Sequence, residues 1–223
     1  MKLLALDTAT EACSAAFLRD GVITGRFEVI GRGHAARLLP MADELLVEAG
    51  ISVRELDAIA FGRGPGGFTG LRIAAGVAQG LAAGIGRPVL PVSDLAALAA
   101  AGARSSGNHR VLACMDARMG QVYWAAFDCS GGAPVAVTEE HLTDPQGVML
   151  PEGKAWFAAG HGFGAYPALG SRLQSRLTGL DASLLPRASD IARIAALDLE
   201  AGKGVAASRA VPVYLRNEVV HRR

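Results

Sequence analysis

Charged residues are scarce in this chain of 223 residues. Asp, Glu, Lys and Arg make up 19% of it, against about 25% in a typical globular protein. The 22 cationic and 21 anionic side chains give a formal net charge of +1, which excludes the strongly basic footprint of a nucleic-acid-binding domain. Hydrophobic residues make up 51% of the chain. We therefore expect part of the surface to be apolar and to face a partner.

Cysteines, histidine pairs and common catalytic signatures are also sparse. The three cysteines at positions 13, 114 and 129 form no CxxC pair, so neither a disulfide framework nor a zinc ribbon is expected. His34 has Leu38 one helical turn later, where a helical metal site would need a second histidine. The sequence has neither a Gly-x-Ser-x-Gly elbow nor a Gly-Lys-Ser/Thr loop. We predict no metal site and no cofactor.

No uncharged run is long enough to cross a bilayer, which takes about 20 apolar residues. The longest runs without Asp, Glu, Lys or Arg span 73–86 and 155–171, and glycines and a proline interrupt the second. Asp7 interrupts the apolar stretch at the N-terminus, so a signal peptide is not expected. We predict a cytoplasmic protein that does not bind membranes.

Hydrophobic periodicity predicts an α/β protein of two lobes, at 1–105 and 106–223, with a polar, Ser- and Gly-containing boundary near 104–109. In the first lobe the expected elements are strands at 2–6, 12–18 and 22–29 in an antiparallel meander, a helix at 35–49, a strand at 56–61, a helix at 70–85 and a strand at 88–92. In the second lobe they are strands at 111–115, 121–127 and 135–138, a helix at 189–200 and a strand at 211–215.

Two segments have the composition of a phosphate-binding site. Asp7, Thr8 and Thr10 follow the first apolar strand, where a carboxylate and two hydroxyls can hold the phosphates of a nucleotide. A glycine-rich turn that contains Gly64, Gly66 and Gly67 follows another strand and opens a helix. Two structural alternatives stay open. Asp7 and Thr8 can instead cap a turn, and the glycines can let two backbones cross closely.

The helix at 70–85 has an unusual surface. Gly76, Gly80 and Gly84 recur every four residues and share one face, at a combined cost of about 3 kcal/mol relative to alanine. A smooth face lets another helix approach closely. Internal burial is one explanation. We prefer an intermolecular helix bundle, formed with the helix at 35–49. The predicted interface residues are Leu38, Met41, Leu45, Ile73, Gly76, Val77, Gly80, Leu81 and Gly84.

A hairpin at 116–123 is predicted in the second lobe. Asp116 and Arg118 can pin the hairpin by pairing with each other. Alternatively, these two side chains belong to a polar cluster that faces the cleft between the lobes.

Five segments in order along the chain resemble the TsaB family, also called YeaZ. The family is the bacterial subunit of the machinery that makes threonylcarbamoyladenosine in tRNA. The chain departs from the family pattern at two positions. Gly67 replaces an expected serine. Gln121 replaces an expected glutamate, and this change weakens any charge pairing with Arg118. The matching segments are LLALDTATEACSAAF (3–17), GHAARLLPMADELL (33–46), GRGPGGFTGLRIAAGVAQGLA (62–82), DARMGQVYWA (116–125) and PVYLRNEVV (212–220).

The resemblance implies a two-lobed, actin-like fold of the sugar kinase and Hsp70 group. TsaD, the catalytic relative, carries a His-x-x-x-His metal pair. The equivalent positions in this chain are His34 and Leu38, so the second metal ligand is missing and the chain resembles a degenerate paralogue. Family members pair with TsaD through the helices at 35–49 and 70–85, and TsaE, an ATPase, joins the complex. The complex modifies the adenosine beside the anticodon of tRNAs that read codons beginning with A.

The resulting hypothesis is a non-catalytic subunit that activates a TsaD-like transferase and meets tRNA only through the complex. A homodimer of the isolated chain is a further possibility. The alternative hypothesis is an ATP-using phosphotransferase or hydrolase, with phosphate held by Asp7, Thr8 and the loop at 64–67.

Overall fold

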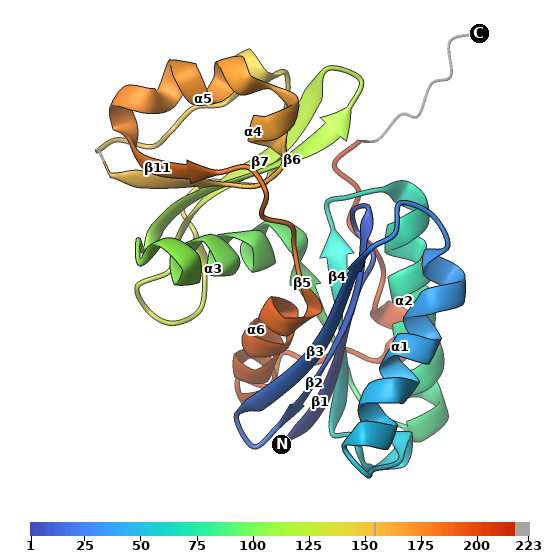
Figure 1. The fold of residues 1–223 in the computed structure, drawn as a ribbon. Coiled ribbons are helices and arrows are strands. Elements are labelled where there is room, and N and C mark those ends of the chain that lie inside the picture. Colours follow the sequence, from blue (N-terminus) through green and yellow to red (C-terminus); the bar gives the residue numbers. More distant parts are fainter. Residues whose placement is uncertain (154, 217–223) are drawn as a thin grey trace, which may run out of the picture.

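The computed structural model describes residues 1–153 and 155–216, which form two β-sheets with helices on both faces of each (Figure 1). The predicted α/β class is confirmed. The last residues of the family-like segment 212–220, from 217 onward, lie outside the described residues.

The first sheet is built from the N-terminal part of the chain. Its strand order is β3-β2-β1-β4-β5. The first three strands form the antiparallel meander that the sequence predicts, and β4 and β5 run parallel to β1. The strands are β1 (Lys2–Asp7), β2 (Ala12–Arg19), β3 (Val22–Val29), β4 (Ala58–Gly64) and β5 (Val89–Ser93).

The second sheet repeats this topology. Its order is β8-β7-β6-β10-β11, with β9 also paired to β7. β6, β7 and β8 are antiparallel, and β10 and β11 run parallel to β6. The chain therefore contains two lobes of equivalent topology. The strands are β6 (Arg110–Arg118), β7 (Gln121–Asp128), β8 (Val135–Ala136), β9 (His141–Thr143), β10 (Trp156–Ala159) and β11 (Leu177–Asp181).

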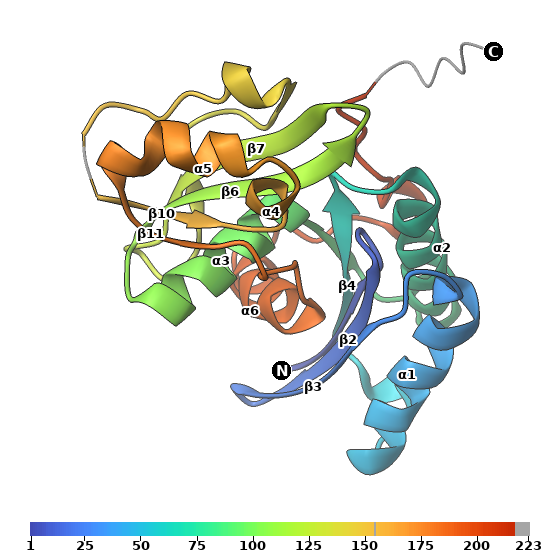
Figure 2. The same ribbon diagram turned by 45° about the horizontal axis from the view of Figure 1, so that its top comes forward.

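Two helices are exchanged between the lobes. α3 (Asp94–Ser106) follows the first sheet but packs on β6, β7 and β10 of the second. α6 (Ala188–Glu200) follows the second sheet but packs on β1, β2, β4 and β5 of the first, opposite α1 and α2 (Figure 2). The division at 105/106 thus separates the strands of the two sheets but not their helices. The others are α1 (His34–Glu48), α2 (Phe68–Ile85), α4 (Gly162–Ala165) and α5 (Pro167–Leu173), with 3₁₀ turns at Val53–Glu55, Pro145–Gly147, Gln174–Arg176 and Ala207–Arg209.

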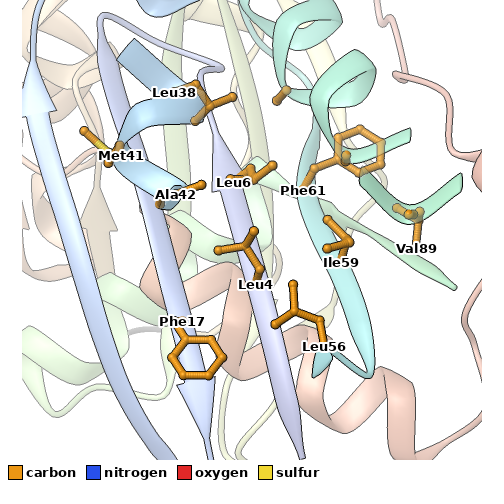
Figure 3. Packing of buried hydrophobic residues seen from close by; sticks show 14 of the residues in the cluster. Leu4, Leu6, Phe17, Leu38, Met41, Ala42, Leu56, Ile59, Phe61 and Val89 are labelled. Carbon is orange, nitrogen blue, oxygen red and sulfur yellow. The ribbon is translucent and has the colours of Figure 1, made fainter. Parts of the chain in front are cut away.

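Each sheet has a hydrophobic core on both faces. In the first lobe, β1, β2 and β4 meet α1 and α2 on one face (Figure 3). On the other face the same sheet meets Ala188, Ile191 and Ala195 of α6. In the second lobe, α3 covers one face, and α4 and α5 cover the other. The helices on both faces of each sheet explain why its strands have almost continuous apolar runs.

The structure differs from the prediction in two ways, because α3, α4, α5, β9, β10 and β11 were not predicted and one predicted strand is absent. α3 is absent from the prediction because it is buried between the two sheets on several sides, including both Leu95 and Leu98. Such burial leaves little contrast between an apolar and a polar face, so the helical period is weak. The signals at the ends of α3 are present, because Ser93 is its N-cap and accepts a hydrogen bond from the Ala96 N–H, and Gly107 follows its last residue. The predicted strand at 211–215 is wrong, because this segment is irregular and is held by a bond from the Val213 N–H to the Arg63 carbonyl at 2.7 Å.

Candidate docking face and interlobe cleft

The two faces of α2 are built from different residues. Its inner face is mostly alanine, with Ala74, Ala78 and Ala82 buried. Its outer face carries the glycine stripe, defined here as Gly76, Gly80 and Gly84. All three are exposed, and a Cβ built on any of them would meet nothing within 4 Å among the described residues outside its own helical turn. The described part of the chain therefore leaves the glycine stripe open and does not bury it.

Half-buried apolar residues lie beside the glycine stripe. Ile73, Val77 and Leu81 pack at the margin of the first-lobe core while keeping part of their surface exposed. These residues and the glycine stripe form the docking face considered below.

The prediction for α1 needs correction. Leu38 and Met41 are completely buried and Leu45 is 1% exposed, because all three point into the core of the first lobe. All three hold α1 on the sheet and cannot contact another protein. Figure 3 shows Leu38 and Met41 on α1 above the strands of this core. The outer surface of α1 instead exposes Leu39 (49%) and Val47 (70%).

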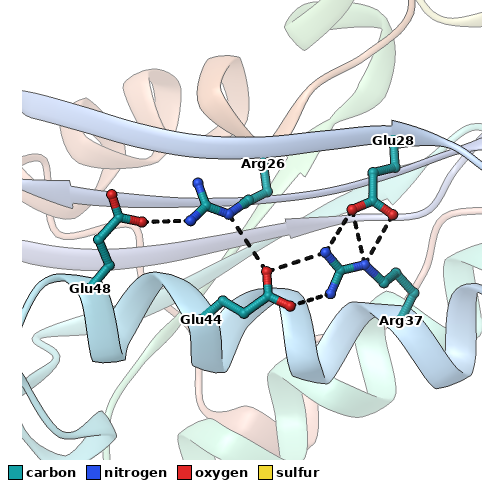
Figure 4. Close-up of polar contacts among 5 residues, drawn as sticks. All are labelled: Arg26, Glu28, Arg37, Glu44 and Glu48. Carbon is teal, nitrogen blue, oxygen red and sulfur yellow. Dashed lines mark hydrogen bonds and ion pairs between the residues drawn. The ribbon is translucent and has the colours of Figure 1, made fainter.

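Ion pairs fasten α1 to the edge strand β3. Arg37 of α1 binds Glu28 of β3 and Glu44 of α1, each at 2.6 Å (Figure 4). Arg26 of β3 binds Glu44 at 3.6 Å and Glu48 at 2.6 Å. Hydrogen bonds from Arg37 hold the pKa of both Glu28 and Glu44 below its usual value. This network of alternating charges fixes the position of α1 relative to the sheet.

A cleft of about 750 Å³ separates the two lobes. Of the predicted phosphate-binding residues, Thr8, Thr10, Gly66 and Gly67 line it. Arginine, carboxylate and imidazole side chains face it, namely Glu11, Arg32, His34, Asp116, Arg118, His161 and Arg216. Phosphate binding in this cleft stays a prediction.

Asp7 and Gly64 do not line the cleft, so their predicted role is not supported. Asp7 is completely buried, and its Oδ1 accepts a hydrogen bond from the Ala9 N–H at 2.8 Å. The Thr8 hydroxyl donates to the Gly70 carbonyl at 2.7 Å. The Asp7 side chain caps its own turn, as in the structural alternative, whereas the Thr8 side chain joins this turn to the first turn of α2.

In the glycine-rich loop, the glycines let two backbone segments cross closely, which is the structural alternative to phosphate binding. The Gly67 N–H donates to the Ala9 carbonyl at 2.7 Å, and a Cβ on Gly66 would lie 2.6 Å from that same oxygen. Gly66 is needed because two backbones cross here. Gly67 differs, since its Cβ would lie 3.5 Å from the Ala9 carbonyl oxygen, and it is the N-cap of α2 without a capping side chain. The family serine would fit and could cap the helix.

The β6–β7 hairpin combines both predicted roles. Arg118 pairs with Asp116 at 3.2 Å, and its N–H donates to the same carboxylate at 2.8 Å. Both residues also line the cleft. Gln121 is opposite Arg118 in the register of the hairpin, and its side-chain amide oxygen accepts a hydrogen bond from Arg216 at 2.9 Å.

Arg216 joins the C-terminal segment to the second lobe. The preceding Tyr214 stacks on Phe68 of α2, with ring centroids 5.2 Å apart, and its hydroxyl accepts from Arg72 at 3.0 Å. Arg216 donates to the Ala117 carbonyl at 3.1 Å. The segment therefore links α2 to the β6–β7 hairpin. Sequence reasoning assigned no site role to Tyr214 or Arg216, whose partners lie far away in the chain.

A Gln121→Glu variant should strengthen this link. A carboxylate would turn the hydrogen bond from the Arg216 guanidinium into an ion pair. We expect the free energy of unfolding to rise by about 1 kcal/mol or less, measured by urea denaturation at low ionic strength. Addition of salt should reduce the gain. A gain that also appears in an Arg216→Gln background would contradict the assignment.

Among the described residues, no group of three or more His, Cys, Asp or Glu side chains could hold a metal ion. In the same range, α2 is the one helix with the length and apolar composition that could cross a membrane, and 28% of it is buried.

The chain was compared with known proteins. A sequence model of the TsaD family, described as tRNA N6-adenosine threonylcarbamoyltransferase, matches residues 27–210. The protein "tRNA threonylcarbamoyladenosine biosynthesis protein TsaB" of Escherichia coli is 42% identical over 98% of this chain and 96% of its own length. The protein of the same name from Haemophilus influenzae is 38% identical over 98% of this chain and 95% of its own length.

A solved structure supports the same relationship. YeaZ from Pseudomonas aeruginosa superimposes with a TM-score of 0.88 at 48% identity, over 96% of this chain and 99% of that one. The duplicated sheets with exchanged helices are thus the two-lobed, actin-like fold that the resemblance implied. The chain belongs to the TsaB (YeaZ) family of tRNA threonylcarbamoyladenosine biosynthesis proteins, which is related to TsaD.

Proposed function

We propose that this chain is a non-catalytic assembly subunit that binds a TsaD-family transferase through the exposed face of α2. In this role it supports formation of N6-threonylcarbamoyladenosine beside the anticodon. The observation that carries the proposal is the open glycine stripe. Its three glycines cost about 3 kcal/mol of helix stability, and no part of the described chain packs on them.

The chemistry of the docking face favours a protein helix as its occupant. Glycine brings two backbones close together, so that dispersion contacts form along the length of both helices. Against lipid the same surface would gain little, since glycine has no side chain to bury. Ile73, Val77 and Leu81 supply the apolar contacts beside the glycine stripe.

The partner is proposed to be a TsaD-family protein because the relatives act in the same modification and TsaD is their catalytic relative. A TsaE-like ATPase would join the complex, a homodimer would form when the partner is missing, and the complex would act in the cytoplasm.

The alternative function, an ATP-using phosphotransferase or hydrolase, receives less support. Thr8, Thr10, Gly66 and Gly67 line the interlobe cleft as that function requires. Asp7, however, is completely buried beneath the turn and cannot reach a nucleotide in the cleft. Calorimetry with ATP and magnesium distinguishes the two functions, because tight binding by the isolated chain would favour the enzyme.

Co-expression with the TsaD-family protein of the same organism tests the proposal. We expect the two chains to elute together, with a mass by light scattering above that of either alone. We also expect modification of tRNA by the partner to require this chain. Separate elution at micromolar concentration, or full activity of the partner alone, would contradict the proposal.

A further inference from the structure

Two buried carboxyl groups meet at the carboxyl ends of the parallel strands of the first sheet. Asp7 ends β1 and Asp94 begins α3, and both are 0% exposed. Gly62 of β4 lies against both of them. A Cβ on Gly62 would lie 2.8 Å from Oδ1 of Asp7 and closer still to Oδ1 of Asp94. The two carboxyl groups therefore share a space that exists because Gly62 has no side chain.

Each carboxyl group has one satisfied oxygen and one unsatisfied oxygen. Oδ1 of Asp7 accepts from the Ala9 N–H at 2.8 Å, and Oδ2 of Asp94 accepts from the Gly64 N–H at 2.5 Å. The remaining oxygens, Oδ2 of Asp7 and Oδ1 of Asp94, are buried and meet no hydrogen-bond donor among the described residues. Unsatisfied buried oxygens of this kind are costly. A single proton between the two groups would supply the missing donor.

We propose that the Asp7–Asp94 pair holds one proton at neutral pH, as a hydrogen bond between a carboxylic acid and a carboxylate. Two ionised groups in this buried space would repel each other. If both groups were protonated, one of the two O–H donors would lack an acceptor. The shared proton ties the end of β1 to the first turn of α3. Because α3 packs on the second sheet, the proton helps to hold the two lobes together.

The charged neighbours do not remove the need for this proton. Burial raises the pKa of Asp94, and the charge of Arg63 on β4 opposes this rise only in part, because its guanidinium is already paired with Glu140 at 3.2 Å. The thiol of Cys13 on β2 stays neutral, since burial raises its pKa to about 11. Burial likewise raises the pKa of Asp7 to about 6, and burial together with the Asp7 charge raises the pKa of Asp94 well above its usual value.

The proposal gives a definite pH dependence of stability. An aspartate in the unfolded chain loses its proton near pH 3.9, so at neutral pH the folded chain binds one proton more than the unfolded chain. Stability from this pair is therefore greatest at low pH and falls as the pH rises. Between pH 7 and 8 the unfolding equilibrium constant should increase about tenfold per pH unit. This window lies above the titration of Asp7 and below that of the buried thiols.

An Asp94→Asn variant tests the proposal. The amide can still accept from the Gly64 N–H and donate to Asp7, so it mimics a permanently protonated group. Chemical denaturation between pH 7 and 8 should show the tenfold increase in wild type and almost no change in the variant. Asp43→Asn, at an exposed carboxylate of α1, should behave as wild type. Equal pH dependence of Asp94→Asn and wild type would overturn the proposal.

Carbon NMR of the wild-type protein labelled at the aspartate carboxyl carbon decides the question even if the variant fails to fold. We expect one aspartate signal in the protonated position at pH 7. A spectrum in which every aspartate is ionised at pH 7 would overturn the proposal.

Discussion

A Gly80→Leu variant should lose its TsaD-family partner and keep its fold. Beyond its own helical turn, no atom of residues 1–153 and 155–216 lies within 4 Å of the new Cβ, so leucine fits this part of the isolated protein. The free energy of unfolding should rise by about 0.5 to 1 kcal/mol, because glycine is a poor helix former. At the interface the same side chain would block close approach, at a cost of about 3 kcal/mol or roughly a hundredfold in Kd. Calorimetric titration with the partner measures this loss.

The matched control is Gly131→Leu. Gly131 lies in the second lobe and also has open space around it, so leucine there should change partner affinity by less than about twofold. Unchanged affinity of Gly80→Leu, together with a normal melting temperature, would show that the partner binds elsewhere.

An Arg104→Ala variant should destabilise the whole protein. Arg104 of α3 binds Asp190 of α6 with two hydrogen bonds, one of them at 3.3 Å. Asp190 is completely buried, while Arg104 is half exposed. Removal of the arginine would leave a buried carboxylate without its partner, which costs about 3 to 5 kcal/mol in a fully buried pair. Because solvent screens the exposed arginine, we expect a loss of about 2 to 3 kcal/mol in urea denaturation.

Lys203→Ala is the matched control for this variant. Lys203 pairs with Asp198 at 2.7 Å on the surface, and surface pairs contribute about 1 kcal/mol or less. A similar small loss in both variants would mean that the pair between the exchanged helices does not stabilise the two-lobed arrangement.

The sequence predicts most strands and the two outer helices of the first lobe because each has a clear period. The meander of β1, β2 and β3 and the boundaries of α1 follow from alternation, turns and the glycine after the helix. α3 has no such period, because two sheets bury it on several sides. The exchange of α3 and α6 between the lobes is a long-range property that local patterns do not contain.

The site shows a similar division. The period of four residues identified the glycine stripe correctly as an unusual surface. The apolar pattern of α1 did not determine which face of that helix is free. An apolar face has the same sequence pattern whether it packs on its own sheet or on a partner. Leu38, Met41 and Leu45 were misassigned for this reason. Asp94 and Arg216 were missed because their partners, Asp7 and Gln121, are distant in the chain.

Amide hydrogen exchange of this chain with and without its TsaD-family partner tests the central claim most directly. The proposed docking predicts that exchange slows along α2, over the turns that carry Gly76, Gly80 and Gly84, and stays unchanged in β10 and β11 of the second sheet. Protection of the second sheet with unchanged exchange in α2 would contradict the proposed docking face.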